Sequence, residues 1–187
     1  MTVLIAALVY ANGVYPERVI ARAVERLRDR GVAMAGALQC TILDTVDRHP
    51  CDLLIEDLAT GEVTPIAEHR GRQARGCRLD VGLLTELAAS VAAGLRDGAP
   101  RLLVVNKFGK TEAEGGGLRD AIAEAVGREI PVLVGVPMRN LDQFRAFAGP
   151  LAVELPVSDA ALAGWLAGHG LVEAAASPVP SRRAVSA

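Results

Sequence analysis

Short apolar runs alternate with segments of helical periodicity along most of the chain. Residues 3–9 form a continuous apolar run, which is typical of a strand buried on both faces of a parallel sheet. Residues 17–30 then place their apolar side chains at helical spacing, and Gly31 is suited to the C-terminal cap. The same patterns predict further strands at 32–40, 101–106, 130–137 and 151–155, and helices at 81–96, 118–127, 141–147 and 159–167. We therefore expect an α/β fold with a mainly parallel sheet and right-handed crossovers.

The middle of the chain carries a different pattern, which predicts a hairpin. Residues 52–58 and 62–68 are strand-like stretches separated by the short turn Ala59-Thr-Gly61. Pro65 has no N–H to donate, so the second strand is expected at an edge. We expect this hairpin as an insertion in the middle of the fold. Asp80, Asn140 and Ser158 each precede a predicted helix and are expected to cap it.

The loop after the strand at 101–106 is the most informative part of the sequence. Of the 20 basic residues only Lys107 and Lys110 are lysines, and both lie here. An ammonium on a flexible stem suits a phosphate or another oxyanion. Glycines in this loop allow close backbone approach, and the helix predicted from residue 118 offers free N–H groups. The loop therefore predicts an anion site, against the alternative of solvated surface lysines.

In a parallel sheet, ligands bind beyond the carboxyl ends of the strands. Three predicted loops meet that condition, at 11–16, 107–117 and 138–140. The first has one glycine, no lysine and no Ser or Thr for magnesium, so it cannot form the usual phosphate cradle. The residues expected to contact a ligand are Asn12, Gly13, Arg78, Asn106, Lys107, Gly109, Lys110, Thr111, Glu112, Gly115, Gly116 and Gly117.

Several other side chains leave alternatives open. Glu112 either binds a hydrated cation or water, or balances the lysines; for Glu114 we favour the balancing role. The arginines of the basic loop at 69–78 either contact an anion or are solvated. Cys77 follows Gly76 and lies among cations, but a nucleophilic cysteine needs a base that the sequence does not place beside it. No metal-ligand spacing is present, so neither a metal nor a catalytic residue is assigned.

Composition narrows the class of protein. With 187 residues and 51% hydrophobic residues, the chain is expected to fold as one domain over 1–170, followed by a flexible tail at 171–187. A net charge of −2 argues against nucleic-acid binding, and no apolar run approaches the length of a membrane span. Three cysteines without CxxC spacing predict a reducing cytoplasm. The sequence leaves open whether the chain forms a homo-oligomer.

Two segments carry a family resemblance. Asp57-Leu-Ala-Thr-Gly-Glu62 resembles the D-x-x-T-G-E hairpin of the small P-loop nucleoside triphosphatases first described from thermophiles. Asn106-Lys-Phe-Gly-Lys-Thr-Glu112 resembles their D-E-x-G-x-x-E motif, whose acidic pair serves magnesium and water. Gly76-Cys-Arg-Leu-Asp80 and residues 105–117 are closer still to an uncharacterised bacterial family related to those enzymes, often encoded beside molybdate-uptake genes.

The resemblance implies a three-layer, P-loop-like fold with helices on both faces of the sheet. It also exposes two departures, because Asn106 is neutral and Lys107 reverses a charge where the family's acidic pair stands. Because the first turn also lacks a lysine and a hydroxyl, magnesium loses both of its usual anchors and the ATP phosphates lose their usual cation. The leading hypothesis is a protein that binds an anion, either a nucleotide phosphate or an oxyanion such as molybdate, without standard hydrolysis. The alternatives are an unusual nucleotide phosphohydrolase and a ligand-free interaction module.

Overall fold

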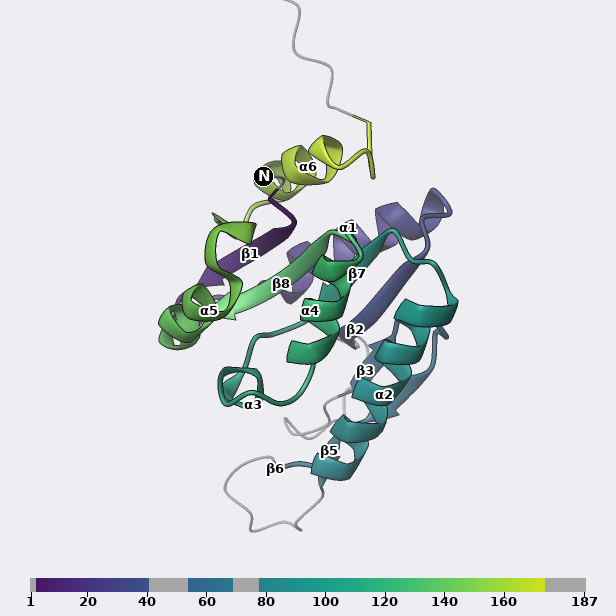
Figure 1. Ribbon diagram of the computed structural model, residues 1–187, viewed down its shortest axis with the longest axis vertical. Helices are drawn as coiled ribbons and strands as arrows, with labels where there is room; N and C mark the ends of the chain where they lie inside the picture. The colour runs from purple at the N-terminus through teal and green to yellow at the C-terminus, as the bar shows by residue number, and fades with distance from the viewer. Residues whose placement is uncertain (1–2, 41–53, 69–77, 174–187) are drawn as a thin grey trace, which may run out of the picture.

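A seven-stranded sheet forms the centre of the molecule. The computed structural model describes residues 3–40, 54–68 and 78–173. The strand order is β4-β3-β2-β7-β8-β1-β9, and all contacts among the last five strands are parallel (Figure 1). The strands are β1 (Ile5–Tyr10), β2 (Met34–Cys40), β3 (Leu54–Asp57), β4 (Val63–Pro65), β7 (Leu102–Val105), β8 (Val132–Pro137) and β9 (Ala152–Leu155). The predicted α/β fold with a mainly parallel sheet is confirmed.

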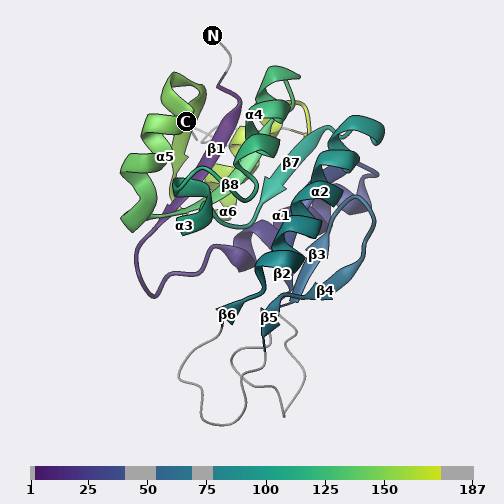
Figure 2. The same ribbon diagram turned by 60° about the horizontal axis from the view of Figure 1, so that its bottom comes forward.

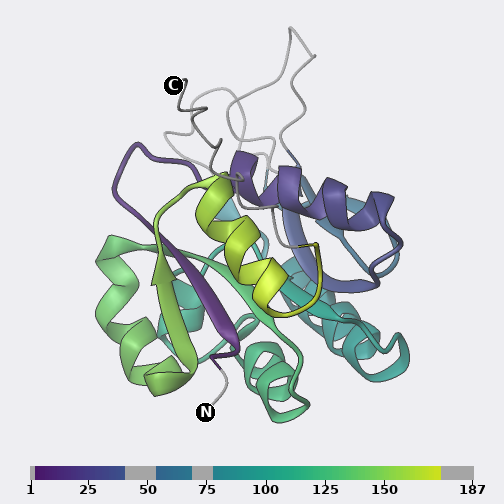
Figure 3. The same ribbon diagram turned by 90° about the horizontal axis from the view of Figure 1, so that it is seen from above.

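Helices cover both faces of this sheet, as the views in Figures 2 and 3 show. One face carries α1 (Glu17–Asp29) and α6 (Asp159–Gly168). The other carries α2 (Val81–Asp97), α4 (Arg119–Gly127) and α5 (Leu141–Ala148). The short helix α3 (Lys110–Ala113) and two 3-10 turns, η1 (Met138–Asn140) and η2 (Gly149–Leu151), complete the helical elements of the described residues.

The alternation of side chains along each strand separates two apolar cores. In β1, Ile5 and Ala7 pack towards α2, α4 and α5, whereas Ala6 and Leu8 pack towards α1 and α6. The central strands β7 and β8 are buried along their whole length, because helices cover them from both sides. This burial on two faces explains why the strands are continuous apolar runs in the sequence.

The predicted hairpin lies at one edge of the sheet. Strand β3 pairs antiparallel with β2, and β4 forms the outermost strand, with Pro65 at its end as expected. The turn is organised by Asp57, whose carboxylate accepts from the N–H groups of Ala59 and Thr60 and from the Ser90 hydroxyl. The D-x-x-T-G-E stretch therefore shapes a turn and fastens it to α2.

The chain leaves the sheet earlier than the sequence pattern suggests. The predicted strand at 62–68 divides into β4 and the two-residue strand β5 (Ala67–Glu68), which pairs with β6 (Arg78–Leu79) in a separate ladder. Of the three predicted caps, only Asp80 accepts side-chain hydrogen bonds from the first turn of its helix. At the other end, Leu171 is buried in the core beneath α6, and residues 174–187 lie outside the described ranges.

Within the described part of the chain, no helix combines the length and the apolar character that crossing a membrane requires.

Candidate functional site

The carboxyl ends of the parallel strands bring three loops to one edge of the sheet. Tyr10 at the end of β1 is in register with Pro137 at the end of β8. Strand β7 ends three positions earlier, where Val105 is level with Val134. The loops at 11–16, 107–117 and 138–140 therefore leave the sheet from the same edge, as the predicted topology required.

The first residue of the β7 loop holds neighbouring strands together. Asn106 is 8% exposed, and its backbone N–H donates to Ala37 O at 3.1 Å. Its side-chain Oδ1 accepts the N–H of Gln39 at 3.3 Å. A Cβ on Gly135 of β8 would come within 2.5 Å of the Asn106 carbonyl oxygen, so only glycine allows this close approach. The Asn106 side-chain oxygen is thus occupied by the backbone of β2.

A buried phenylalanine anchors the loop two residues later. Phe108 is fully buried against the rings of Phe144 and Phe147, at centroid distances of 5.3 and 5.8 Å. Its N–H donates to Gly135 O at 2.8 Å, and its carbonyl oxygen accepts from Asn140 Nδ2 at 3.0 Å. Lys107 lies between two fixed residues and is itself exposed. The loop therefore presents the Lys107 ammonium from a rigid backbone.

Glu112 stabilises the loop from within. Its Oε2 accepts the N–H of Gly109 at 2.8 Å, and its Oε1 accepts the N–H of Leu118 at 3.2 Å. Gly117 has a φ of +59° and a Cβ there would meet Glu112 Oε1 at 2.1 Å, so this glycine makes room for the carboxylate. Both oxygens of Glu112 are engaged by backbone donors, which favours a structural role over metal or water binding.

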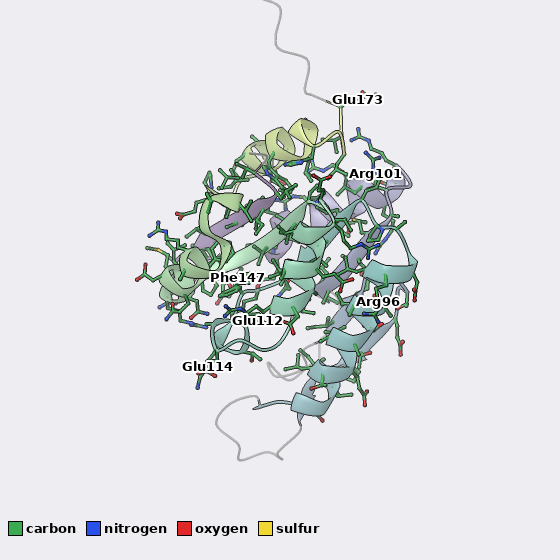
Figure 4. The ribbon with its side chains drawn as sticks, viewed as in Figure 1. Arg96, Arg101, Glu112, Glu114, Phe147 and Glu173 are labelled. Atoms are coloured by element: carbon green, nitrogen blue, oxygen red, sulfur yellow. The ribbon has the colours of Figure 1, made fainter. Side chains whose placement is uncertain are left out.

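The two lysines of the loop have different surroundings. The Lys110 Nζ lies 3.6 Å from Glu114 Oε1, and the side chains are 85% and 65% exposed. An exposed pair of this kind contributes little to stability. Lys107 has no ion pair among the described residues. Figure 4 shows Glu112 on α3 and Glu114 directly after it, on the side of the molecule away from Arg101. Glu114 thus balances Lys110, as we favoured, whereas Lys107 is a cation of the loop without an ion pair to any residue that the structure describes.

The first turn lacks the features of a phosphate cradle. Asn12 and Gly13 are exposed, and Gly13 adopts a φ of +83°. Pro16 is the N-cap of α1 and has no N–H to offer an anion. Glu17 occupies the first helical position, and its buried Oε2 has no hydrogen-bond partner within the described part of the chain. A carboxylate at the positive end of α1 opposes an incoming anion there.

Two polar side chains beside this turn were not singled out from the sequence. Burial, with a further contribution from Glu17, raises the pKa of Tyr10 to about 12, while Arg139 acts in the opposite direction. The phenol therefore stays neutral and able to donate a hydrogen bond. Arg139 is exposed in η1, which follows β8. Its place directly after a parallel strand was the signal available in the sequence.

The other residues predicted to contact a ligand lie in and around α3 or in β6. Thr111, Gly115, Gly116 and Gly117 are exposed in and after α3, while Gly109 is partly buried at its start. The backbone of Arg78 lies in β6. Residues 69–77, with Cys77, lie outside the described ranges, and so do His49 and Cys51.

The described cysteine and acidic side chains show no sign of a reactive or metal-binding centre in the described ranges. Burial, followed by the charge of Glu56, raises the pKa of the Cys40 thiol. In the described ranges, no three acidic, histidine or cysteine side chains converge as metal ligands.

This sheet order, with helices on both faces and loops gathered at one edge, defines a fold of the type found in P-loop nucleoside triphosphatases. The crystal structure of THEP1 from the hyperthermophile Aquifex aeolicus has this fold, with a TM-score of 0.56 and 17% sequence identity over 84% of this chain and 90% of that one. Residues 5–165 match the family described as a protein of unknown function, DUF2478, and the chain belongs to that family. The resemblance inferred from the sequence is confirmed.

A curated relative extends the comparison. The molybdenum import ATP-binding protein ModC 2 of Bradyrhizobium diazoefficiens is 30% identical over 163 residues. The match covers 86% of this chain but 18% of the relative. The chain therefore spans less than a fifth of the length of that protein.

Proposed function

We propose that this protein binds a nucleotide phosphate or a tetrahedral oxyanion such as molybdate at the carboxyl edge of its sheet, without magnesium-dependent hydrolysis by the standard P-loop route. The fold shared with THEP1 favours a ligand at this edge. The name of ModC 2 pairs ATP binding with molybdenum import, which directs attention to these two ligand classes.

One observation carries the proposal: exposed cations follow two adjacent parallel strands, β7 and β8, at this edge of the sheet. The first turn of α1 presents Glu17 and Pro16 in place of a lysine and a free N–H. Lys107 follows β7, and Arg139 follows β8, and both are exposed. Two cations on adjacent strand ends, with the Tyr10 phenol as a neutral donor, suit a tetrahedral anion.

The same geometry argues against the standard hydrolytic mechanism. Magnesium in phosphoryl transfer needs hard oxygen ligands, usually carboxylates. At the corresponding positions, the Asn106 oxygen is bonded to Gln39, Lys107 carries a positive charge, and Glu112 is bonded to Gly109 and Leu118. These groups leave a nucleotide bound but uncleaved.

Calorimetry and thermal unfolding with ATP, GTP, phosphate, sulfate, molybdate and tungstate test the proposal. A ligand that binds the folded state raises the unfolding midpoint. We expect Lys107→Ala to weaken binding of the preferred anion by roughly tenfold or more. Lys110→Ala is the matched control, because its ammonium is already paired with Glu114, and its affinity should stay within about twofold of wild type.

The salt dependence of anion binding and an assay for nucleotide hydrolysis give the results that would contradict the proposal. Binding through Lys107 and Arg139 should weaken as ionic strength rises, because both groups are exposed. Equal losses in the two lysine variants, or no binding of any of the anions, would refute the proposed site. Magnesium-dependent phosphate release that disappears in Lys107→Ala would instead establish the phosphohydrolase alternative.

The interaction module is the second candidate, and one observation favours it. Val14, Tyr15 and Met138 are 42%, 73% and 59% exposed, and all three belong to loops at this edge. Exposed apolar side chains that are close together often mark a protein interface. Stable binding of a protein partner that Tyr15→Ser abolishes, in a chain that binds no anion, would support this candidate.

A further inference from the structure

The two loops that carry exposed cations are joined by a side-chain hydrogen bond. Lys107 is followed directly by Phe108 in the loop after β7, and Arg139 is followed directly by Asn140 in η1. Asn140 Nδ2 donates to the Phe108 carbonyl oxygen at 3.0 Å. Asn140 is 9% exposed and Phe108 is fully buried, so little water competes for this bond. The loops are therefore connected one residue beyond each cation.

The Asn140 side chain serves the neighbouring loop and not its own helix. An asparagine directly before a helix ordinarily accepts the free N–H groups of the first turn. Asn140 precedes α5, yet its side chain makes no such cap. Its carboxamide is instead turned towards the loop after β7. The local stabilisation of α5 is thus given up for a contact that holds two loops together.

Phe108 fixes the same loop through its backbone and its ring. Its N–H donates to Gly135 O of β8 at 2.8 Å, while its carbonyl oxygen accepts from Asn140. Its ring packs on Phe144 and Phe147, both of α5, at centroid distances of 5.3 and 5.8 Å. The loop after β7, η1 and α5 therefore form one packed unit. The backbones that carry the two cations are held at a set spacing within this unit.

The carboxylates of these segments leave the two cations unpaired. Those that follow β7 are bonded to backbone N–H groups or lie beside Lys110, as described above. Asp142 Oδ1, in the first turn of α5, lies 3.8 Å from Arg145 Nη1. Glu17, at the start of α1, pairs with neither Lys107 nor Arg139 in the part of the chain that the structure describes. Both cations are thus available to a ligand.

We propose that Asn140 is a positioning residue of the anion site: its hydrogen bond to Phe108 sets the spacing of Lys107 and Arg139, so that the two cations act on an anion as a unit. This inference rests on the proposed function and names what gives that site its shape. Asn140 itself touches no ligand in this role. Long, flexible side chains lose freedom when they converge on one anion, and a fixed spacing of their backbones lowers that cost.

Titration of the full chain with molybdate, sulfate, phosphate and ATP tests the inference. Asn140→Ala removes the donor to Phe108 and keeps both cations. We expect it to weaken the tightest-bound of the four by roughly fivefold or more. In a Lys107→Ala background the same change should cost under about twofold, because one of the two cations to be positioned is absent. A purely structural residue would not show this dependence on Lys107.

A matched control separates positioning from lost stability. Asp57→Ala removes the acceptor of three hydrogen bonds in the hairpin, three strands away from β8 in the sheet. At a temperature where circular dichroism shows both variants folded, its anion affinity should stay within about twofold of wild type. If Asn140→Ala does not fold, Asn140→Ser replaces it, since its shorter hydroxyl side chain does not reach the Phe108 carbonyl oxygen.

The outcomes distinguish this inference from the proposed function. Wild-type affinity in Asn140→Ala together with a loss in Lys107→Ala overturns the inference and leaves the proposed anion site standing. An equal loss from Asn140→Ala with and without Lys107 also overturns it, because the asparagine then acts independently of that cation. A comparable loss in Asp57→Ala assigns the effect to stability and likewise overturns it. No binding of any of the four anions to the wild-type chain overturns both.

Discussion

At the scale of single residues, several polar side chains that look like ligands prove to hold the backbone. Asp57 is 3% exposed and accepts three hydrogen bonds, and Glu112 accepts two. The sequence offers no means of separating such carboxylates from catalytic ones, because both kinds occur next to glycines in loops. Lys107 and Lys110 are also alike in the sequence, and only the Glu114 contact distinguishes them.

Replacing Asp57 should destabilise the fold. Asp57→Ala removes the acceptor for Ala59, Thr60 and Ser90, so we expect it to lower the free energy of unfolding by about 2–4 kcal/mol. Glu62→Ala, at an exposed position of the same turn, is the control and should cost under about 0.5 kcal/mol. Urea unfolding measures both, and equal values would disprove the role of Asp57.

The ionisation of Tyr10 provides a second residue-scale prediction. In Tyr15→Phe, Tyr10 is the chain's one phenol, and its absorbance should titrate with a midpoint near the raised pKa of about 12. Because the folded pKa exceeds the usual value of about 10, this phenol favours folding fully below pH ~10. That contribution is lost as pH rises from there towards 12. Circular dichroism confirms folding, and a midpoint near 10 in folded protein contradicts the prediction.

At the scale of elements, sequence patterns located the long helices and buried strands but missed the short ones. Helix α3 has four residues, too few for a periodic pattern, and depends on contacts made by Glu112 with backbone beyond the helix. Strands β5 and β6 have two residues each. Asn140 and Ser158 precede helices, yet their side chains do not cap them. Such details depend on tertiary neighbours, which the local sequence does not specify.

The C-terminal end of α4 provides the prediction at this scale. Glu129 has a φ of +57°, and the N–H of Ile130 closes the helix on Ala125 O at 2.8 Å. A left-handed residue at this position is ordinarily glycine. Glu129→Gly should therefore raise the free energy of unfolding by about 0.5–1 kcal/mol. Glu129→Ala keeps the strain and serves as the control in thermal unfolding; a gain shared by both would point to charge instead.

At the scale of the whole molecule, the class of fold was predictable and the sheet order was not. The alternation of strands and helices implies parallel pairing, and the convergence of three loops at one edge follows from it. Nothing in the order along the chain states that the hairpin lies outside β2, because that depends on which edge remains open after the parallel strands assemble.

The division of the interior by the sheet limits how this family can change. Leu27 and Leu162 belong to one core, and Val91 and Phe144 to the other, with the strands as a wall between them. Volume lost on one side cannot be restored by a larger side chain on the other, because close-packed backbone separates them. Compensating substitutions are therefore confined to one side of the sheet. The side chains of the two cores are expected to change independently of each other.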